Sequence, residues 1–215
     1  MPEISMTYGS VDTIALAKET RDQAKELYTD WDKRAVGYDN INSDSVIVDV
    51  GGYRGRWSYQ MAVRYNPNLF IFEPQPWCCE AMKELLKDYK AQIYPFALGT
   101  KKGSFPICNF ETDGCSFEEE LAGEHRTLGG SLPMRKMSTE FEIIGLDHID
   151  VMHMNIEGGE MTLVPHMLKN NIFPEILLLQ HHDPVYTQDM YTMLGKHYDL
   201  LYDYGTILSA WRFNV

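Results

Sequence analysis

The most constraining feature of this sequence is a glycine-rich turn between two apolar runs, each followed by an acid. The run 46–48 is β-branched and typical of a buried strand, and Asp49 stands at its end. Three glycines follow within the range 51–55, and a second apolar run, 70–72, ends at Glu73. A strand, a glycine turn, a helix, a second strand and an acid are the parts from which an open α/β sheet builds a nucleotide-type pocket.

The spacing and charge of this segment indicate which ligand fits. A dinucleotide-binding fold carries Gly-x-Gly-x-x-Gly, whereas this chain has Gly-Gly-x-x-Gly at 51–55, with Asp49 two residues before the first glycine. A carboxylate there would repel a pyrophosphate and attract an ammonium group. Glu73 could accept two ribose hydroxyls. The combination favours S-adenosylmethionine, which has an ammonium group and no phosphate. The alternative is a tight turn after a buried strand, with Glu73 on the surface.

Length and composition limit the class of protein and its partners. With 215 residues the chain is long enough for one α/β domain with a helical extension, and we divide it into 1–40 and 41–215. The net charge is −12 and no basic run is present, so we expect no nucleic acid partner. The four cysteines lack zinc-like spacing and are expected as free thiols in a reducing compartment. Since we find no secretion signal and no apolar run of spanning length, we expect a cytoplasmic protein without a membrane span.

Hydrophobic periodicity predicts alternating strands and helices after an amphipathic helix over 11–36. The segment 111–137 has no clear period and several glycines, and we interpret it as a lid or substrate loop. The other expected elements are strands over 45–50, 69–73, 92–96, 104–110, 151–156, 175–180, 198–203 and 206–213, helices over 55–66, 76–90, 160–170 and 186–196, a turn over 97–103, and regular structure over 140–146.

The last two expected strands have only a short turn near 203–205 between them, so they must run antiparallel. Alternating strands and helices before them favour a mostly parallel sheet covered on both faces. The predicted fold class is therefore α/β, a three-layer Rossmann-like sheet, mostly parallel with an antiparallel C-terminal hairpin. This is the architecture of class I methyltransferases.

Six segments within residues 45–182 resemble, in the same order, segments of the FkbM-type methyltransferases. This class I family uses S-adenosylmethionine and mostly methylates hydroxyl oxygens. The resembling segments are Val48-Asp-Val-Gly-Gly-Tyr-Arg-Gly55, Phe72-Glu-Pro74, Tyr94-Pro-Phe-Ala-Leu-Gly99, Gly145-Leu-Asp147, Met154-Asn-Ile-Glu-Gly-Gly-Glu160 and Leu177-Leu-Leu-Gln-His-His182.

The resemblance implies a role for each matched position. Asp49 and the turn glycines would hold the methionine end of S-adenosylmethionine, and Glu73 would take the ribose hydroxyls. Residues 96–98 would lie near the adenine, and residues 153–157 would face the transferred methyl group and its acceptor. The implied cofactor-binding residues are Asp49, Gly51, Gly52, Tyr53, Gly55, Glu73, Pro74, Phe96, Ala97, Leu98 and Asn155.

Two amides replace carboxylates of the family pattern. The family usually has Lys-x-Asp-x-Glu-Gly where this chain has His153-Met-Asn-Ile-Glu-Gly158, and usually a glutamate where Gln180 stands. An amide cannot take a proton or hold a metal well, so we expect no metal and do not assign Asn155 as a base. A catalytically inactive binding or scaffold protein is therefore an alternative.

The candidate catalytic residues are His182, Glu157, Asn155 and His153, all near the carboxyl ends of the strands ending at 156 and 180. His182 is the preferred general base because it matches a histidine of the family. The predicted function is S-adenosylmethionine-dependent O-methylation of a hydroxyl on a sugar or other small molecule. A nicotinamide oxidoreductase is a third interpretation, which the missing Gly-x-Gly-x-x-Gly disfavours.

Overall fold

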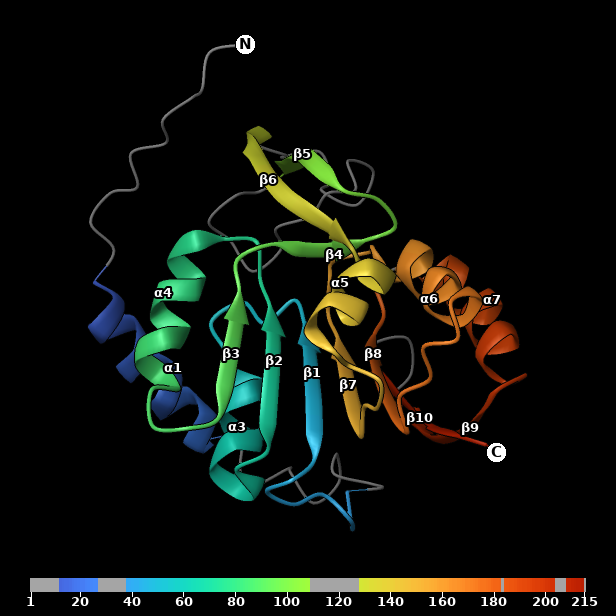
Figure 1. Cartoon of the computed structure of the whole chain (residues 1–215), viewed down its shortest axis with the longest axis horizontal. Helices are drawn as coiled ribbons and strands as arrows, with labels where there is room; N and C mark the ends of the chain where they lie inside the picture. Colours follow the sequence, from blue (N-terminus) through green and yellow to red (C-terminus); the bar gives the residue numbers. More distant parts are fainter. Residues whose placement is uncertain (1–11, 27–37, 109–127, 183, 204–207, 215) are drawn as a thin grey trace.

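A seven-stranded sheet forms the middle layer of the protein (Figure 1). The computed structural model describes residues 12–26, 38–108, 128–182, 184–203 and 208–214. β10 is antiparallel to both of its neighbours, and the other neighbouring strands pair in parallel. The predicted fold class is confirmed. In spatial order the strands are β3 (Ala91–Tyr94), β2 (Asn68–Phe72), β1 (Val46–Val50), β7 (Val151–Met154), β8 (Ile176–Gln180), β10 (Leu208–Phe213) and β9 (Tyr198–Asp203).

Helices cover both faces of this sheet, and alternation along β1 shows which residues face which layer. Val48 and Val50 pack on one face with residues of α5, α6 and α7. Ile47 packs on the other face with residues of α1, α3 and α4, and Asp49 points to that second face because strand side chains alternate. The helices are α1 (Thr13–Glu26), α3 (Arg56–Tyr65), α4 (Pro76–Leu85), α5 (Met137–Ile144), α6 (Glu160–Lys169) and α7 (Pro184–Leu194).

A second, three-stranded sheet lies above the carboxyl ends of β1, β2 and β3 in Figure 1. Its order is β4 (Ala97–Gly99), β6 (Leu128–Lys136), β5 (Gly103–Cys108). The predicted turn over 97–103 is therefore wrong in its first part, because residues 97–99 pair in parallel with residues 134–136. A three-residue strand paired this far along the chain leaves no local periodicity in the sequence.

The segment expected to be irregular, 111–137, is regular in its C-terminal part. β6 begins at Leu128, and α5 begins at Met137, three residues before the expected start at 140. Residues 109–127 lie outside the described residues, so the interpretation as a lid remains a prediction. The N-terminal helix follows the expected spacing, since Leu16, Thr20 and Ala24 are all buried. Its predicted continuation over 27–36 also lies outside the described residues.

The loop between β1 and α3 is tightly held by the neighbouring strands. Gly51 has a φ of +86°, and its N–H donates to the carbonyl of Phe72 over 2.9 Å. A Cβ on Gly51 would stand 1.9 Å from the backbone oxygen of Asn155, at the end of β7. Glycine is therefore required at this position by the packing of the chain itself, in addition to any ligand.

This crowding gives a stability prediction with a matched control. Gly145 has a similar φ of +80° at the C-cap of α5, but a Cβ there would meet nothing within 4 Å. Both alanine variants carry the strain of a positive φ, on the order of 1–2 kcal/mol. Gly51→Ala must also displace the backbone of β7, and we expect it to lose at least about 2 kcal/mol more than Gly145→Ala. Urea unfolding measures both, and equal losses would contradict the assigned crowding.

Candidate functional site

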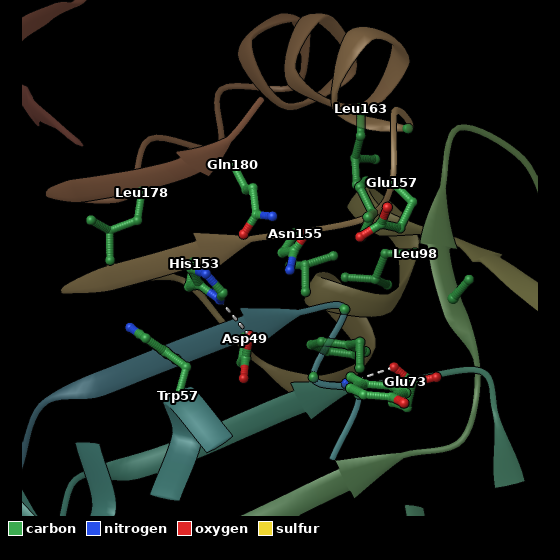
Figure 2. Close-up of a pocket in the computed structure, with 18 of the residues that line it drawn as sticks. Asp49, Trp57, Glu73, Leu98, His153, Asn155, Glu157, Leu163, Leu178 and Gln180 are labelled. Carbon is green, nitrogen blue, oxygen red and sulfur yellow. Dashed lines mark hydrogen bonds and ion pairs between the residues drawn. The ribbon is translucent and has the colours of Figure 1, made fainter. Parts of the chain in front are cut away.

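The carboxyl ends of β1, β2, β7 and β8 border one cavity of about 1150 Å³ (Figure 2). The small sheet contributes β4, and the face of α3 that lies against β1 closes another side. Pockets for a single small ligand usually measure about 300–1,000 Å³. The cavity therefore has room for a cofactor-sized molecule together with part of a second one.

Nearly all predicted site residues line this cavity, and the exceptions are Gly55 and Phe96. Gly55 is the N-cap of α3, with a φ of 78°. Phe96 is buried in the core against Phe72, with the Arg135 guanidinium 4.1 Å from its ring centroid. The predicted residues that do line the cavity are Asp49, Gly51, Gly52, Tyr53, Glu73, Pro74, Ala97, Leu98, His153, Asn155, Glu157 and His182.

Several lining residues were missed by the sequence analysis. Trp57 lies in the first turn of α3, two residues after the last turn glycine, and its place directly after the motif could have identified it. Gln180, which the sequence analysis named as a replaced carboxylate but not as a site residue, ends β8 and also lines the cavity. Thr100, Lys101 and Met134 reach the cavity only because β4 pairs with β6. That pairing has no local signal in the sequence.

Glu73 is the acid that follows β2, and its carboxylate holds the two neighbouring loops. One oxygen accepts the N–H of Tyr53 and the other accepts the N–H of Gln75, each over 2.8 Å. Burial raises the pKa of Glu73 to about 7, and the nearby Asp49 acts in the same direction, while the two backbone hydrogen bonds lower it. Its charge therefore changes close to neutral pH, at a position inside the cavity.

Asp49 is buried at the end of β1 and is bound by two side chains. One carboxylate oxygen lies 2.8 Å from Nδ1 of His153, and the other accepts the hydroxyl hydrogen bond of Ser58. The resemblance implied that Asp49 binds the methionine end of a cofactor. In the structure it lines the cavity, and each of its oxygens has one partner within the protein.

The turn after β7 is closed by an acid that the sequence analysis did not single out. Glu160, buried in the first turn of α6, accepts the N–H of Ile156 over 2.7 Å and the N–H of Gly158 over 2.8 Å. Glu157, between Ile156 and Gly158, has a φ of 53°. This turn directs Glu157 to the cavity wall and leaves Glu160 as a structural residue.

His182 lies between these two acids. Its Nε2 is 3.2 Å from Glu157, and its Nδ1 is 3.2 Å from Glu160. Burial of the imidazole opposes its protonation, but the two carboxylates outweigh burial and raise the pKa of His182 to about 10. His182 is therefore a cation at neutral pH and a poor proton acceptor, which disfavours the role of general base expected for it.

Apart from the ring nitrogens of His182, which face the carboxylates of Glu157 and Glu160, two polar atoms of cavity-lining residues are buried without a hydrogen bond to any described part of the chain. They are Oδ1 of Asn155, an acceptor, and Nε of Arg54, a donor. The Arg54 guanidinium lies 5.3 Å from the ring centroid of Tyr53 and 5.5 Å from that of Trp77. Buried polar groups almost always have partners, so these atoms indicate a ligand that supplies a donor and an acceptor.

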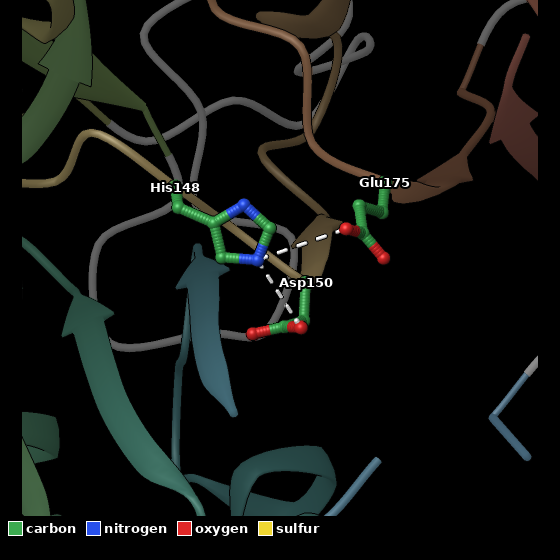
Figure 3. Close-up of side chains that lie close together, drawn as sticks. All are labelled: His148, Asp150 and Glu175. Carbon is green, nitrogen blue, oxygen red and sulfur yellow. Dashed lines mark ion pairs between the residues drawn. The ribbon is translucent and has the colours of Figure 1, made fainter. Parts of the chain in front are cut away.

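A second ionisable cluster lies at the opposite ends of the same strands (Figure 3). Nε2 of His148 is 3.3 Å from an oxygen of Asp150 and 3.7 Å from an oxygen of Glu175, just before β7 and β8 begin. The second oxygen of Asp150 accepts the N–H of Val46. His148 and Glu175 are well exposed, so solvent screens the charges of this cluster. We assign it a structural role, in which it holds together the beginnings of β1, β7 and β8.

Two further expectations concern membrane-spanning segments and the state of the cysteines. No helix in the described ranges is both long and apolar enough to cross a membrane. Cys78, Cys79 and Cys108 are buried, and Cys115 lies outside the described residues.

The position of His182 predicts a defined pH dependence of stability. Because its pKa is raised from 6.5 to about 10 in the folded protein, its contribution is complete below pH 6.5 and is lost as the pH rises to 10. We expect wild type to exceed His182→Gln by about 2 kcal/mol at pH 6.5 and by much less at pH 10. Urea unfolding across this range tests it, and a constant difference would contradict the ion pairs.

Comparison with known proteins supports the fold. No family model matches the chain, and no curated protein matches it in sequence, so the FkbM resemblance is not confirmed. The METTL16 MTase domain matches with a TM-score of 0.55 at 11% identity, covering 95% of this chain and 81% of that one. A Klebsiella pneumoniae protein described as an O-methyltransferase matches with a TM-score of 0.50 at 10% identity, covering 98% and 93%. This chain has the Rossmann-like fold of these methyltransferase structures.

Proposed function

We propose that this chain is an S-adenosylmethionine-dependent methyltransferase that transfers the methyl group to a hydroxyl of a sugar or another small molecule. The observation that carries the proposal is the set of polar groups in the cavity. Each oxygen of Glu73 keeps a second lone pair beside its backbone hydrogen bond, and Oδ1 of Asn155 is a buried acceptor without a hydrogen bond to the described residues. Nε of Arg54 is a buried donor without such a bond, on a guanidinium whose Nη1 lies 3.7 Å from Glu19. These groups match the functional groups of one cofactor.

The match can be followed group by group. A ribose has two neighbouring hydroxyls, which a carboxylate such as Glu73 accepts with charge-assisted hydrogen bonds. The methionine part carries an ammonium group, a donor for Oδ1 of Asn155, and a carboxylate, an acceptor for Arg54. A pyrophosphate would instead bring negative charge toward Asp49 and Glu73.

The chemistry expected here is a displacement at the methyl carbon, for which the bound cofactor supplies an electrophilic methyl group on a positively charged sulfur. The protein has to align the acceptor with that methyl group, and positioning alone can contribute roughly 7–11 kcal/mol. The cavity of about 1150 Å³ leaves space for an acceptor beside the cofactor. The net charge of −12 favours a small-molecule acceptor over a nucleic acid. The FkbM resemblance supports a hydroxyl acceptor.

The second candidate function is binding of the cofactor without turnover. It is favoured by the amides of Asn155 and Gln180, which both line the cavity at positions where the FkbM-type pattern usually has carboxylates. The two functions share the cofactor and differ in methyl transfer, so cofactor binding tests both.

The first experiment is thermal unfolding with S-adenosylmethionine, S-adenosylhomocysteine or NAD in excess. A ligand at about 100 times its dissociation constant stabilises the protein by roughly 2.7 kcal/mol. We expect the two adenosyl ligands to raise the midpoint by about 5 °C and NAD to leave it unchanged. Stabilisation by NAD alone, or by none of the three, would refute the proposal.

The charge of Glu73 predicts a pH dependence of cofactor binding. Since only the ionised carboxylate accepts both ribose hydroxyls, and the pKa of Glu73 is about 7, affinity should fall as the pH drops below 7 and level off above it. Titration calorimetry with S-adenosylhomocysteine at pH 6 and pH 8 measures this difference.

Two variants serve as controls. Glu73→Gln should bind about tenfold or more weakly at pH 8 and lose the pH dependence, because it removes charge-assisted hydrogen bonds. Glu80→Gln, which removes an exposed acid of α4 paired with Lys83, should behave as wild type. A pH-dependent affinity that survives in Glu73→Gln would assign the titration to another group.

A further inference from the structure

Two residues that face each other across neighbouring strands form a pair inside the cavity. β1 and β7 run in parallel with Asp49 and His153 in register, so both side chains point to the face covered by α3. Nδ1 of His153 lies 2.8 Å from a carboxylate oxygen of Asp49, as Figure 2 shows by its dashed line. We refer to these two residues as the Asp49–His153 pair.

The surroundings hold this pair in one orientation. The indole of Trp57 stacks on the imidazole with a centroid distance of 4.5 Å and an interplanar angle of 18°. Ser58, the next residue of α3, donates its hydroxyl to the other oxygen of Asp49. Asp49 is 1% exposed and His153 side chain 12% exposed, so neither can turn toward bulk water without breaking these contacts.

The chemistry of a carboxylate decides where the imidazole carries its proton. An ionised carboxylate only accepts hydrogen bonds, so Nδ1 of His153 must be the donor. In the neutral ring the proton is then on Nδ1, and Nε2 has a free lone pair. No hydrogen bond joins Nε2 to the described residues, and His153 lines the cavity. The structure therefore presents an oriented proton acceptor to the cavity.

We propose that His153, oriented by Asp49 and Trp57, is the catalytic base that accepts the proton of the acceptor hydroxyl. This inference rests on the proposed function. The hydroxyl oxygen forms a bond to the methyl carbon while the carbon–sulfur bond breaks and its electron pair stays on sulfur. The hydroxyl proton moves to Nε2 of His153, and the ionised Asp49 stabilises the imidazolium until the proton passes to water.

His182 cannot take this role in the same way. Its two ring nitrogens both face carboxylates, those of Glu157 and Glu160, at 3.2 Å. His153 faces one carboxylate and has its second nitrogen available. The difference between the histidines is therefore one of geometry. Carboxylates on both sides of His182 favour a protonated ring with a structural role, whereas a single carboxylate beside His153 leaves one ring nitrogen available to accept a proton.

The first test measures the tautomer in the wild-type protein and needs no acceptor. Nitrogen NMR of protein labelled with ¹⁵N-histidine, at a pH where the ring of His153 is neutral, should show the proton on Nδ1 and none on Nε2. In Asp49→Asn the amide can donate to Nδ1, and the proton should move to Nε2. A neutral ring that carries its proton on Nε2 in wild type would overturn the proposal.

The second test compares two probe acceptors with labelled S-adenosylmethionine. Phenol needs its proton removed during transfer, whereas the more acidic 4-nitrophenol is largely ionised in mildly alkaline buffer. We expect His153→Gln to lower transfer to phenol by about 10²- to 10⁴-fold and transfer to 4-nitrophenol far less. The control His166→Gln changes a histidine of α6 outside the cavity and should leave both rates unchanged.

The outcomes separate this proposal from the proposed function. The role of base would be overturned if His153→Gln still bound S-adenosylhomocysteine and methylated phenol and 4-nitrophenol with equally reduced rates, or with unchanged rates. The cofactor assignment would stand in either case. Wild-type protein that binds the cofactor but methylates neither probe would also count against it. Failure of wild type to bind S-adenosylhomocysteine would refute the proposed function itself.

Discussion

The buried carboxylate of Asp49 is the constraint on which the centre of this structure depends. It stands in a strand whose neighbouring residues, Val48 and Val50, belong to the apolar core. A buried charge is tolerated only when it is well paired. Its partners, Ser58 and His153, come from α3 and β7, so one charge joins a helix layer to two strands. Removing either partner would leave an incompletely hydrogen-bonded buried carboxylate, a change that can cost about 1–3 kcal/mol.

The other acids at this edge of the sheet have different tasks, and their neighbours decide which. Glu160 accepts two backbone N–H groups and shapes the turn after β7. Glu73 also accepts two, but it lines the cavity and keeps acceptor capacity for a ligand. Glu157 faces the cavity wall beside the charged His182. Much of the cavity wall is thus held by hydrogen bonds within the protein, which favours a preformed binding site.

Sequence reasoning located the strands of the main sheet well and the small sheet poorly. Buried parallel strands such as β1 and β8 are continuous apolar runs that end in polar residues, a strong local signal. β4 is three residues long and pairs with a strand more than thirty positions away, so nothing near it marks a strand. Ala97 and Leu98 of β4 were named through the family resemblance, whereas Met134 of β6, which pairs with this strand and also lines the cavity, was missed.

The sequence by itself determined the fold class, the glycine turn and part of the residues around the cavity, because hydrophobic period and turn chemistry are local properties. The tertiary structure decided the roles within that set. Several acids and histidines lie near one edge, and their spacing along the chain does not show which of them pair. Strand register placed His153 opposite Asp49, and the turn closed by Glu160 placed His182 between two carboxylates. Charge and proton position depend on neighbours within a few ångströms, and only folding brings those neighbours together.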